Sequence, residues 1–131
     1  MSANATNAMV FDSSALILFL NDALPAAALE LLDQGLHAQQ ILISAIVRAE
    51  VLAWPGHTVT SLTAALALLE ACQLIVVNAG IADEGARIRR EFGLKLPDAL
   101  IAATARLQQA ALVTANARDF RRVPGLMLIE T

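Results

Sequence analysis

The stretch MVFDSSALILFL, residues 9–20, decides how the chain is expected to begin folding. Its first three residues are apolar and predict a short buried strand, and residues 13–20 predict the helix that follows it. Asp12 stands between the two. An ionised carboxylate is costly to bury unless it is paired, hydrogen-bonded or bound to a metal. Asp12 is therefore the first candidate functional group.

The same alternation of short aliphatic runs and helical segments continues along the chain. Further strands are predicted at residues 41–43, 74–77, 111–114 and 126–130, the last at an edge of the sheet. Helices are predicted at residues 25–35, 45–54, 58–73, 81–93 and 97–109. This alternation favours an α/β fold with a short, mainly parallel sheet of four to five strands flanked by helices.

Length and composition indicate one domain without disulfide or zinc. We expect residues 9–131 to form it, and residues 1–8 to be a disordered leader or a cloning remnant. The single Cys72 cannot form an internal disulfide, which favours a reducing, cytoplasmic setting. The apolar stretch 15–32 is interrupted by Asn21, Asp22 and Pro25, so no membrane-spanning segment is expected.

The charge of the chain is unevenly distributed. The formal net charge is −3, which by itself argues against a nucleic-acid partner. Residues 1–86 carry eight acids and one base, whereas residues 87–131 carry eight bases and four acids. Such asymmetry can place an anion-attracting surface beside an acidic pocket, although solvated helix faces explain the charges equally well. The candidate RNA-binding residues are Arg87, Arg89, Arg90, Lys95, Arg118, Arg121 and Arg122.

Two further acids stand in apolar surroundings. Glu50 lies in the helix predicted after the second strand, and Asp98 lies in the first turn of a nearly apolar helix. If these acids converge with Asp12, a cation would relieve the cost of burying them. Oxygen ligands without His or Cys select hard ions, so Mg²⁺ or Mn²⁺ is the expected metal. Such ions activate water and stabilise charge on a phosphate under attack.

Each of these acids also has a purely structural explanation. Asp12 could cap the helix that begins at Ser13, and Asp98 could complement the dipole of its own helix. Glu50 could pair with Arg48 or Arg106. Three separate explanations would then have to hold at three separate elements, which favours a shared site.

Four motifs in this order resemble those of the PIN-domain nucleases, and among them the VapC-type toxins of toxin–antitoxin pairs. The motifs are VFDSSALI at 10–17, ISAIVRAEVL at 43–52, KLPDALIAATA at 95–105 and LVTANARDF at 112–120. The resemblance covers residue 9 to about residue 129. It implies a PIN-like three-layer sandwich and a metal-dependent endoribonuclease that acts as the toxin of such a pair.

The resemblance also implies site residues and partners. The implied catalytic and metal-binding acids are Asp12, Glu50, Asp98 and Asp119. The polar residues expected to support them are Ser13, Thr114 and Asn116. The implied cofactor is Mg²⁺ or Mn²⁺, and the implied partners are an RNA substrate, a cognate antitoxin and a second copy of the chain. For Asp119, a turn capped by the Asn three residues earlier is an equally good explanation.

Three other functions are weighed against this one. A phosphatase that works through a phosphoaspartate would carry D-x-D where this chain has Asp12-Ser13-Ser14. A receiver domain would need an acidic pair at that place and a suitably placed lysine, whereas Lys95 follows a helix. A noncatalytic RNA-binding or protein-interaction module with the same fold is the remaining alternative, and the complete acidic set argues against it.

Overall fold

The structure is a computed structural model that describes residues 7–131. Its strands are β1 (Met9–Phe11), β2 (Ile41–Ser44), β3 (Gln73–Ile75), β4 (Ala111–Thr114) and β5 (Leu128–Glu130). Its helices are α1 (Ser13–Leu20), α2 (Ala26–His37), α3 (Ala45–Leu52), α4 (Val59–Glu70), α5 (Ala79–Phe92), α6 (Leu96–Leu107) and α7 (Ala117–Phe120).

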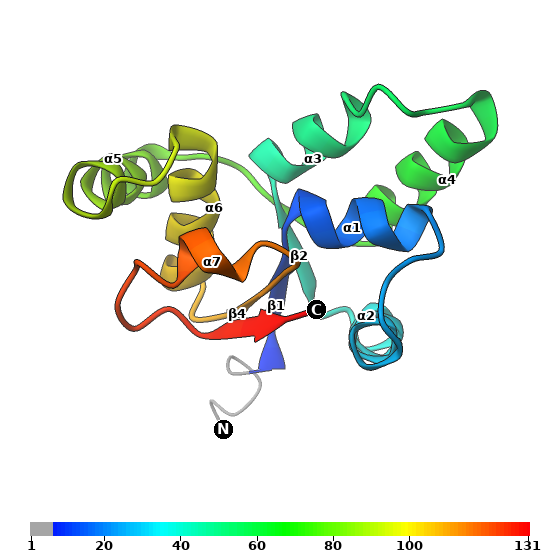
Figure 1. The fold of residues 1–131 in the computed structure, drawn as a ribbon, viewed down its shortest axis with the longest axis horizontal. Helices are drawn as coiled ribbons and strands as arrows, with labels where there is room; N and C mark the ends of the chain where they lie inside the picture. The colour runs from blue at the N-terminus through cyan, green and yellow to red at the C-terminus, as the bar shows by residue number, and fades with distance from the viewer. Residues whose placement is uncertain (1–6) are drawn as a thin grey trace.

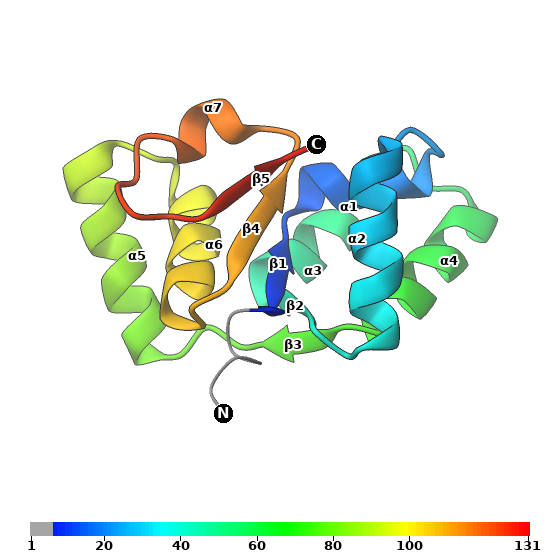
Figure 2. The ribbon, with the colours of Figure 1, turned by 90° about the horizontal axis from the view of Figure 1, so that it is seen from below.

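The five strands form one parallel sheet in the order β3-β2-β1-β4-β5. In both ribbon views α5 and α6 lie on one side of the sheet, and α1, α2 and α4 lie on the other (Figures 1 and 2). Helix α3 packs against α1, α4 and α6, and so connects the two helical layers at one end of the sheet. The expected α/β architecture, a parallel sheet between helices, is confirmed.

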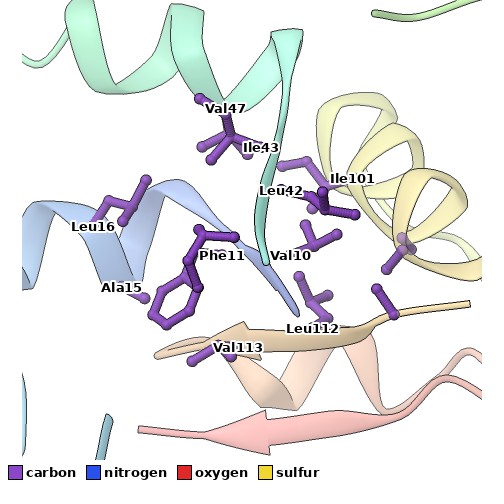
Figure 3. Close-up of a cluster of buried hydrophobic side chains, with 14 of the residues drawn as sticks. Val10, Phe11, Ala15, Leu16, Leu42, Ile43, Val47, Ile101, Leu112 and Val113 are labelled. Carbon is purple, nitrogen blue, oxygen red and sulfur yellow. The ribbon is translucent and has the colours of Figure 1, made fainter. Parts of the chain in front are cut away.

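The central strand contributes a side chain to each face of the sheet. Successive residues of a strand point to opposite faces. Figure 3 shows Val10 toward the side of α6, near Ile101, and Phe11 toward α1, near Leu16. Each of these four side chains is at most 1% exposed. The residue before Asp12 is therefore locked into the core, which fixes where β1 ends.

Local sequence signals start and stop several helices as expected. Ser44 caps α3, and its hydroxyl accepts a hydrogen bond from the Ile46 backbone N–H at 3.1 Å. Helix α5 begins at Ala79, two residues before its predicted start, because the Asn78 side chain caps it and accepts a hydrogen bond from the Ile81 backbone N–H. That helix ends at Gly93, whose φ of 75° lies in the left-handed region that glycine adopts without strain.

Other boundaries differ from the sequence-based prediction. Helix α2 does not stop at Gly35 but continues to His37, and the chain turns at Gln39, whose φ is 57°. Gly35 therefore lies inside the helix. A larger residue would not fit there, because a Cβ would come within 2.2 Å of the Ile41 side chain. Close packing of helix on strand thus explains this glycine.

The helix predicted at 58–73 ends at Glu70, and the strand predicted at 74–77 is β3, shifted to 73–75. Among residues 7–131 this strand lies at the edge of the sheet and pairs only with β2. Residues 76–77 extend beyond the register that pairs Ser44 with Ile75.

The start of the chain is described only in part. Residues 1–6 of the predicted leader lie outside the described residues. Within that leader Ala8 accepts a hydrogen bond from the Ala111 backbone N–H and packs against the core. No helix within residues 7–131 has the length and apolar character needed to cross a membrane.

Candidate functional site

The candidate site lies at the edge of the sheet where β1 and β4 end. The register pairs Phe11 with Val113, so the residues that follow these two positions are neighbours. Helices α1, α3, α6 and α7 lie around this edge (Figure 1). In open α/β sheets, ligands bind beyond the carboxyl ends of the strands. The acids predicted from the sequence lie on or directly before these four helices.

Asp12 is the most enclosed of these acids, with 4% of its surface exposed. Its Oδ1 accepts hydrogen bonds from the Ser14 hydroxyl at 2.7 Å and the Ala15 backbone N–H at 3.0 Å. Its Oδ2 accepts one from the Thr114 hydroxyl at 2.5 Å. Burial raises the pKa of the Asp12 carboxyl, and these hydrogen bonds oppose the rise. Asp12 therefore caps α1 with one oxygen while the other points to β4.

Replacing Thr114 by Val should destabilise the metal-free protein by about 1–3 kcal/mol near pH 8, because it removes a donor to a buried carboxylate. The pKa of Asp12 is already raised, and this loss should raise it further. An acid whose pKa is raised by folding lowers the free energy of unfolding at a pH where it is ionised, and this loss of stability disappears as the pH falls and the acid is protonated. The loss should therefore shrink as the pH falls. Urea unfolding at several pH values measures it, with Thr114→Ser as the control that keeps the hydroxyl.

Glu50 is held by a hydroxyl from another helix. The Ser13 Oγ donates a hydrogen bond to its Oε1 at 2.9 Å. Neither predicted arginine partner lies beside it: one pairs with Glu70 and the other with Glu84. The ion-pair explanation for Glu50 is therefore wrong, and this carboxylate is left facing the edge where β1 ends.

Asp98 links the four acids electrostatically. It is the third residue of α6, and burial is the largest cause that raises the pKa of its carboxyl. Three negative charges raise this pKa further, in decreasing order those of Glu50, Asp12 and Asp119, whereas Lys95 lowers it. Like charges have this effect only when they are near one another. Acids from four elements thus share one electrostatic environment.

Asp119 lies in α7 and uses both carboxylate oxygens. Its Oδ2 accepts a hydrogen bond from the Asn116 side-chain amide at 3.2 Å, and its Oδ1 accepts one from the Arg122 guanidinium at 3.1 Å. Asn116 precedes α7 but makes no side-chain cap bond to its backbone. The predicted Asn-capped turn is therefore wrong in its bonding: the amide contacts the acid instead.

The donor set suits a hard divalent cation, but the acids are not gathered around one point. All four are carboxylates, the ligand type that Mg²⁺ and Mn²⁺ prefer. Within residues 7–131, no group of three or more Asp, Glu, His or Cys side chains is placed so that it could hold a metal ion. Hydroxyls hold Asp12 and Glu50, and a guanidinium and an amide hold Asp119. The chemistry of these residues fits such a metal, although no three of the described side chains are placed to hold it together.

Ser14 is a site residue that was not predicted from the sequence. Ser13 was predicted as the hydroxyl beside the first acid, and it contacts Glu50 instead. The Ser14 hydroxyl donates a hydrogen bond to Asp12 and accepts one from the Ala115 backbone N–H at 3.1 Å. These two bonds connect the end of β1 to the end of β4. The only signal in the sequence is the second hydroxyl of the pair. Which of the two meets Asp12 depends on how α1 begins.

The seven basic candidates differ in their partners. Arg89 donates a hydrogen bond to the Leu94 carbonyl oxygen at 2.9 Å. Three of the seven form ion pairs: Arg87 with Glu84 and Glu91, Arg121 with Glu130, and Arg122 with Asp119. The candidates that pair with no carboxylate among the described residues are Arg89, Arg90, Lys95 and Arg118. Arg89 and Arg90 also line a pocket of about 420 Å³ beside Leu96.

Residues 9–126 match the family model described as PIN domain. Ribonuclease VapC19 of Mycobacterium tuberculosis is 36% identical over 107 residues, which cover 78% of this chain and 84% of that protein. A toxin–antitoxin complex from Klebsiella pneumoniae contains a chain that is 30% identical, with a TM-score of 0.74 over 95% of this chain and 100% of that one.

VapBC2 from Rickettsia felis, solved bound to a DNA fragment from its promoter, has a TM-score of 0.80 at 23% identity. That alignment covers 94% of this chain and 98% of the other. At this identity the likeness concerns the fold alone.

Proposed function

Because this chain belongs to the PIN-domain family, and within it to the VapC-type proteins, we propose that it is a metal-dependent endoribonuclease and the toxin of a toxin–antitoxin pair. One observation carries the proposal. Glu50, Asp12 and Asp119 all raise the pKa of Asp98, so four acids from different elements lie near one another at one end of the sheet. Separate structural roles would not need this proximity.

The residues of this site have distinct roles in the proposed reaction. The four carboxylates would bind Mg²⁺ or Mn²⁺, which supplies an activated water and charge stabilisation at the phosphate. Thr114 and Ser14 keep the Asp12 carboxylate in a fixed orientation through hydrogen bonds of 2.5 and 2.7 Å. Ser13 does the same for Glu50. Fixed carboxylates lower the cost of assembling the reacting groups in the transition state.

The direct test is cleavage of RNA by the purified chain, freed of any partner. We expect cleavage with Mg²⁺ or Mn²⁺ and none with excess EDTA, and sequencing of the new ends should define the cleavage site. Cleavage that persists in EDTA would contradict the metal role. RNA binding without cleavage under any metal would favour the noncatalytic module instead.

RNA binding is proposed to depend on the basic residues without ion-pair partners. A double substitution, Arg90→Gln with Arg118→Gln, should weaken binding and lower the salt slope by up to about two, since each phosphate contact releases counterions. Arg87→Gln is the matched control, because Glu84 and Glu91 already neutralise that guanidinium. Fluorescence anisotropy in EDTA, over a range of salt, measures both quantities. An unchanged slope in the double variant would reject this surface.

We also propose a cognate antitoxin as a partner. Helix α1 and the end of α3 leave little apolar surface free for it, because Leu16 is fully buried and Phe19 and Leu52 are packed against the core. The exposed apolar side chains in this region are instead Leu29 on α2 and Val59, Leu62 and Leu66 on α4.

Co-expression with the adjacent reading frame should relieve growth arrest and yield a stable complex. A harmless chain that copurifies with nothing would contradict the toxin assignment.

A second copy of the chain is also expected as a partner. The mass of the free chain in solution, measured by light scattering, tests this homodimer.

A further inference from the structure

Among the acids of the site, Asp119 differs in being bound to a cation of the chain itself. Seven ion pairs occur within residues 7–131, and only the Arg122–Asp119 pair includes one of the four acids. The Arg122 guanidinium lies 3.1 Å from Asp119 Oδ1. Hydroxyls, which carry no charge, hold Asp12 and Glu50.

The same guanidinium has a second anchor that does not depend on Asp119. Its second terminal nitrogen donates a hydrogen bond to the Gly93 carbonyl oxygen at 3.2 Å. Gly93 ends α5 and begins the short connection to α6, the helix that carries Asp98. If Asp119 turned away, Arg122 would keep this bond and stay at the edge of the site.

We propose that Arg122 is the built-in counter-ion of the acidic site. Arg122 holds Asp119 in the metal-free protein, and a divalent cation must displace it from this carboxylate in order to bind there. This inference rests on the proposed metal-dependent function. It follows from the geometry: the Arg122 guanidinium contacts Asp119 Oδ1 with one terminal nitrogen and the Gly93 carbonyl oxygen with the other, and no three of the described acidic, His or Cys side chains are placed to hold a metal. Arg122 lowers the repulsion among the acids while the metal is absent. It also competes with the metal for Asp119.

The test is the affinity for Mn²⁺ without RNA, measured by isothermal titration calorimetry or by the electron paramagnetic resonance signal of free Mn²⁺. Arg122→Gln removes the competing charge and should tighten Mn²⁺ binding about threefold to fivefold, the upper part of the range for an exposed ion pair. Arg121→Gln is the matched control. It removes the same charge from the adjacent position, but Arg121 pairs with Glu130 on β5 and not with an acid of the site. Its Mn²⁺ affinity should stay within about twofold of the unaltered chain.

A second pair of variants separates competition for Asp119 from a general charge effect. In a chain that carries Asp119→Asn, the guanidinium has no carboxylate partner to hold, so adding Arg122→Gln should tighten Mn²⁺ binding less than about twofold. Circular dichroism of each variant confirms that the fold is kept. Arg122→Lys keeps the charge but lacks the fork that reaches both Gly93 and Asp119, so it should give an intermediate Mn²⁺ affinity.

The outcomes distinguish this inference from the function on which it rests. Tighter binding in Arg122→Gln but not in Arg121→Gln supports the counter-ion role. Equal or weaker Mn²⁺ binding in Arg122→Gln, with clear binding by the unaltered chain, overturns this role and leaves the proposed nuclease intact. No Mn²⁺ binding by the unaltered chain overturns both.

Discussion

Asp98→Asn should lower RNA cleavage about 100-fold or more while the chain stays folded. The negative charges of Glu50, Asp12 and Asp119 all raise the pKa of the Asp98 carboxyl, so Asp98 lies near the other three acids. Asn has almost the same volume but carries no charge, and a metal site that loses a charged ligand loses several kcal/mol of transition-state stabilisation. Single-turnover cleavage at saturating Mg²⁺ measures the effect.

Two controls accompany this variant. Asp33→Asn removes an acid that is exposed on α2 and paired with His37, and it should leave cleavage unchanged. Thermal unfolding without metal should show Asp98→Asn to be as stable as the unaltered chain or slightly more so, because the repulsion among the acids falls. Cleavage within about twofold of the unaltered chain would contradict the assignment of Asp98 to the site.

Phe11→Ala should lower the free energy of unfolding by about 3–5 kcal/mol, the usual cost of deleting a buried aromatic ring. Phe11 is fully buried between the sheet and α1 (Figure 3) and directly precedes Asp12. A domain has only about 5–15 kcal/mol of stability in total, so this single change removes a large part of it. Urea unfolding measures the loss, with the same dependence of the unfolding free energy on urea concentration assumed for both proteins.

The comparison with a less buried ring tests the cause. Phe92 is only half-buried at the end of α5, and Phe92→Ala should cost less than half as much. Phe11→Leu fills most of the space and should remain folded, which allows cleavage to be measured with an altered core beneath Asp12. A loss below about 1 kcal/mol in Phe11→Ala would show that this ring does not support β1.

The order and type of the elements follow from the sequence alone, because these features depend on residues only a few positions apart. An aliphatic run followed by Asp12 predicts β1 and α1 with the bounds that the structure has, and Ser44 and Gly93 start and end helices where they stand. The prediction is wrong where a distant element decides the outcome. Gly35 was predicted to end α2, but it lies inside this helix, and the need for a glycine there comes from Ile41 on the next strand, which packs against it.

The four acids could be proposed from the sequence, but their partners could not. Thr114 meets Asp12 across 102 positions of the chain, Ser13 meets Glu50 across 37, and Arg122 reaches Gly93 across 29. These contacts depend on the order β3-β2-β1-β4-β5, which brings the ends of β1 and β4 side by side. Side-chain spacing along the chain carries no information about that order. The sequence by itself thus determined which acids the protein has and on which elements they lie, and the tertiary structure decided which group holds each of them.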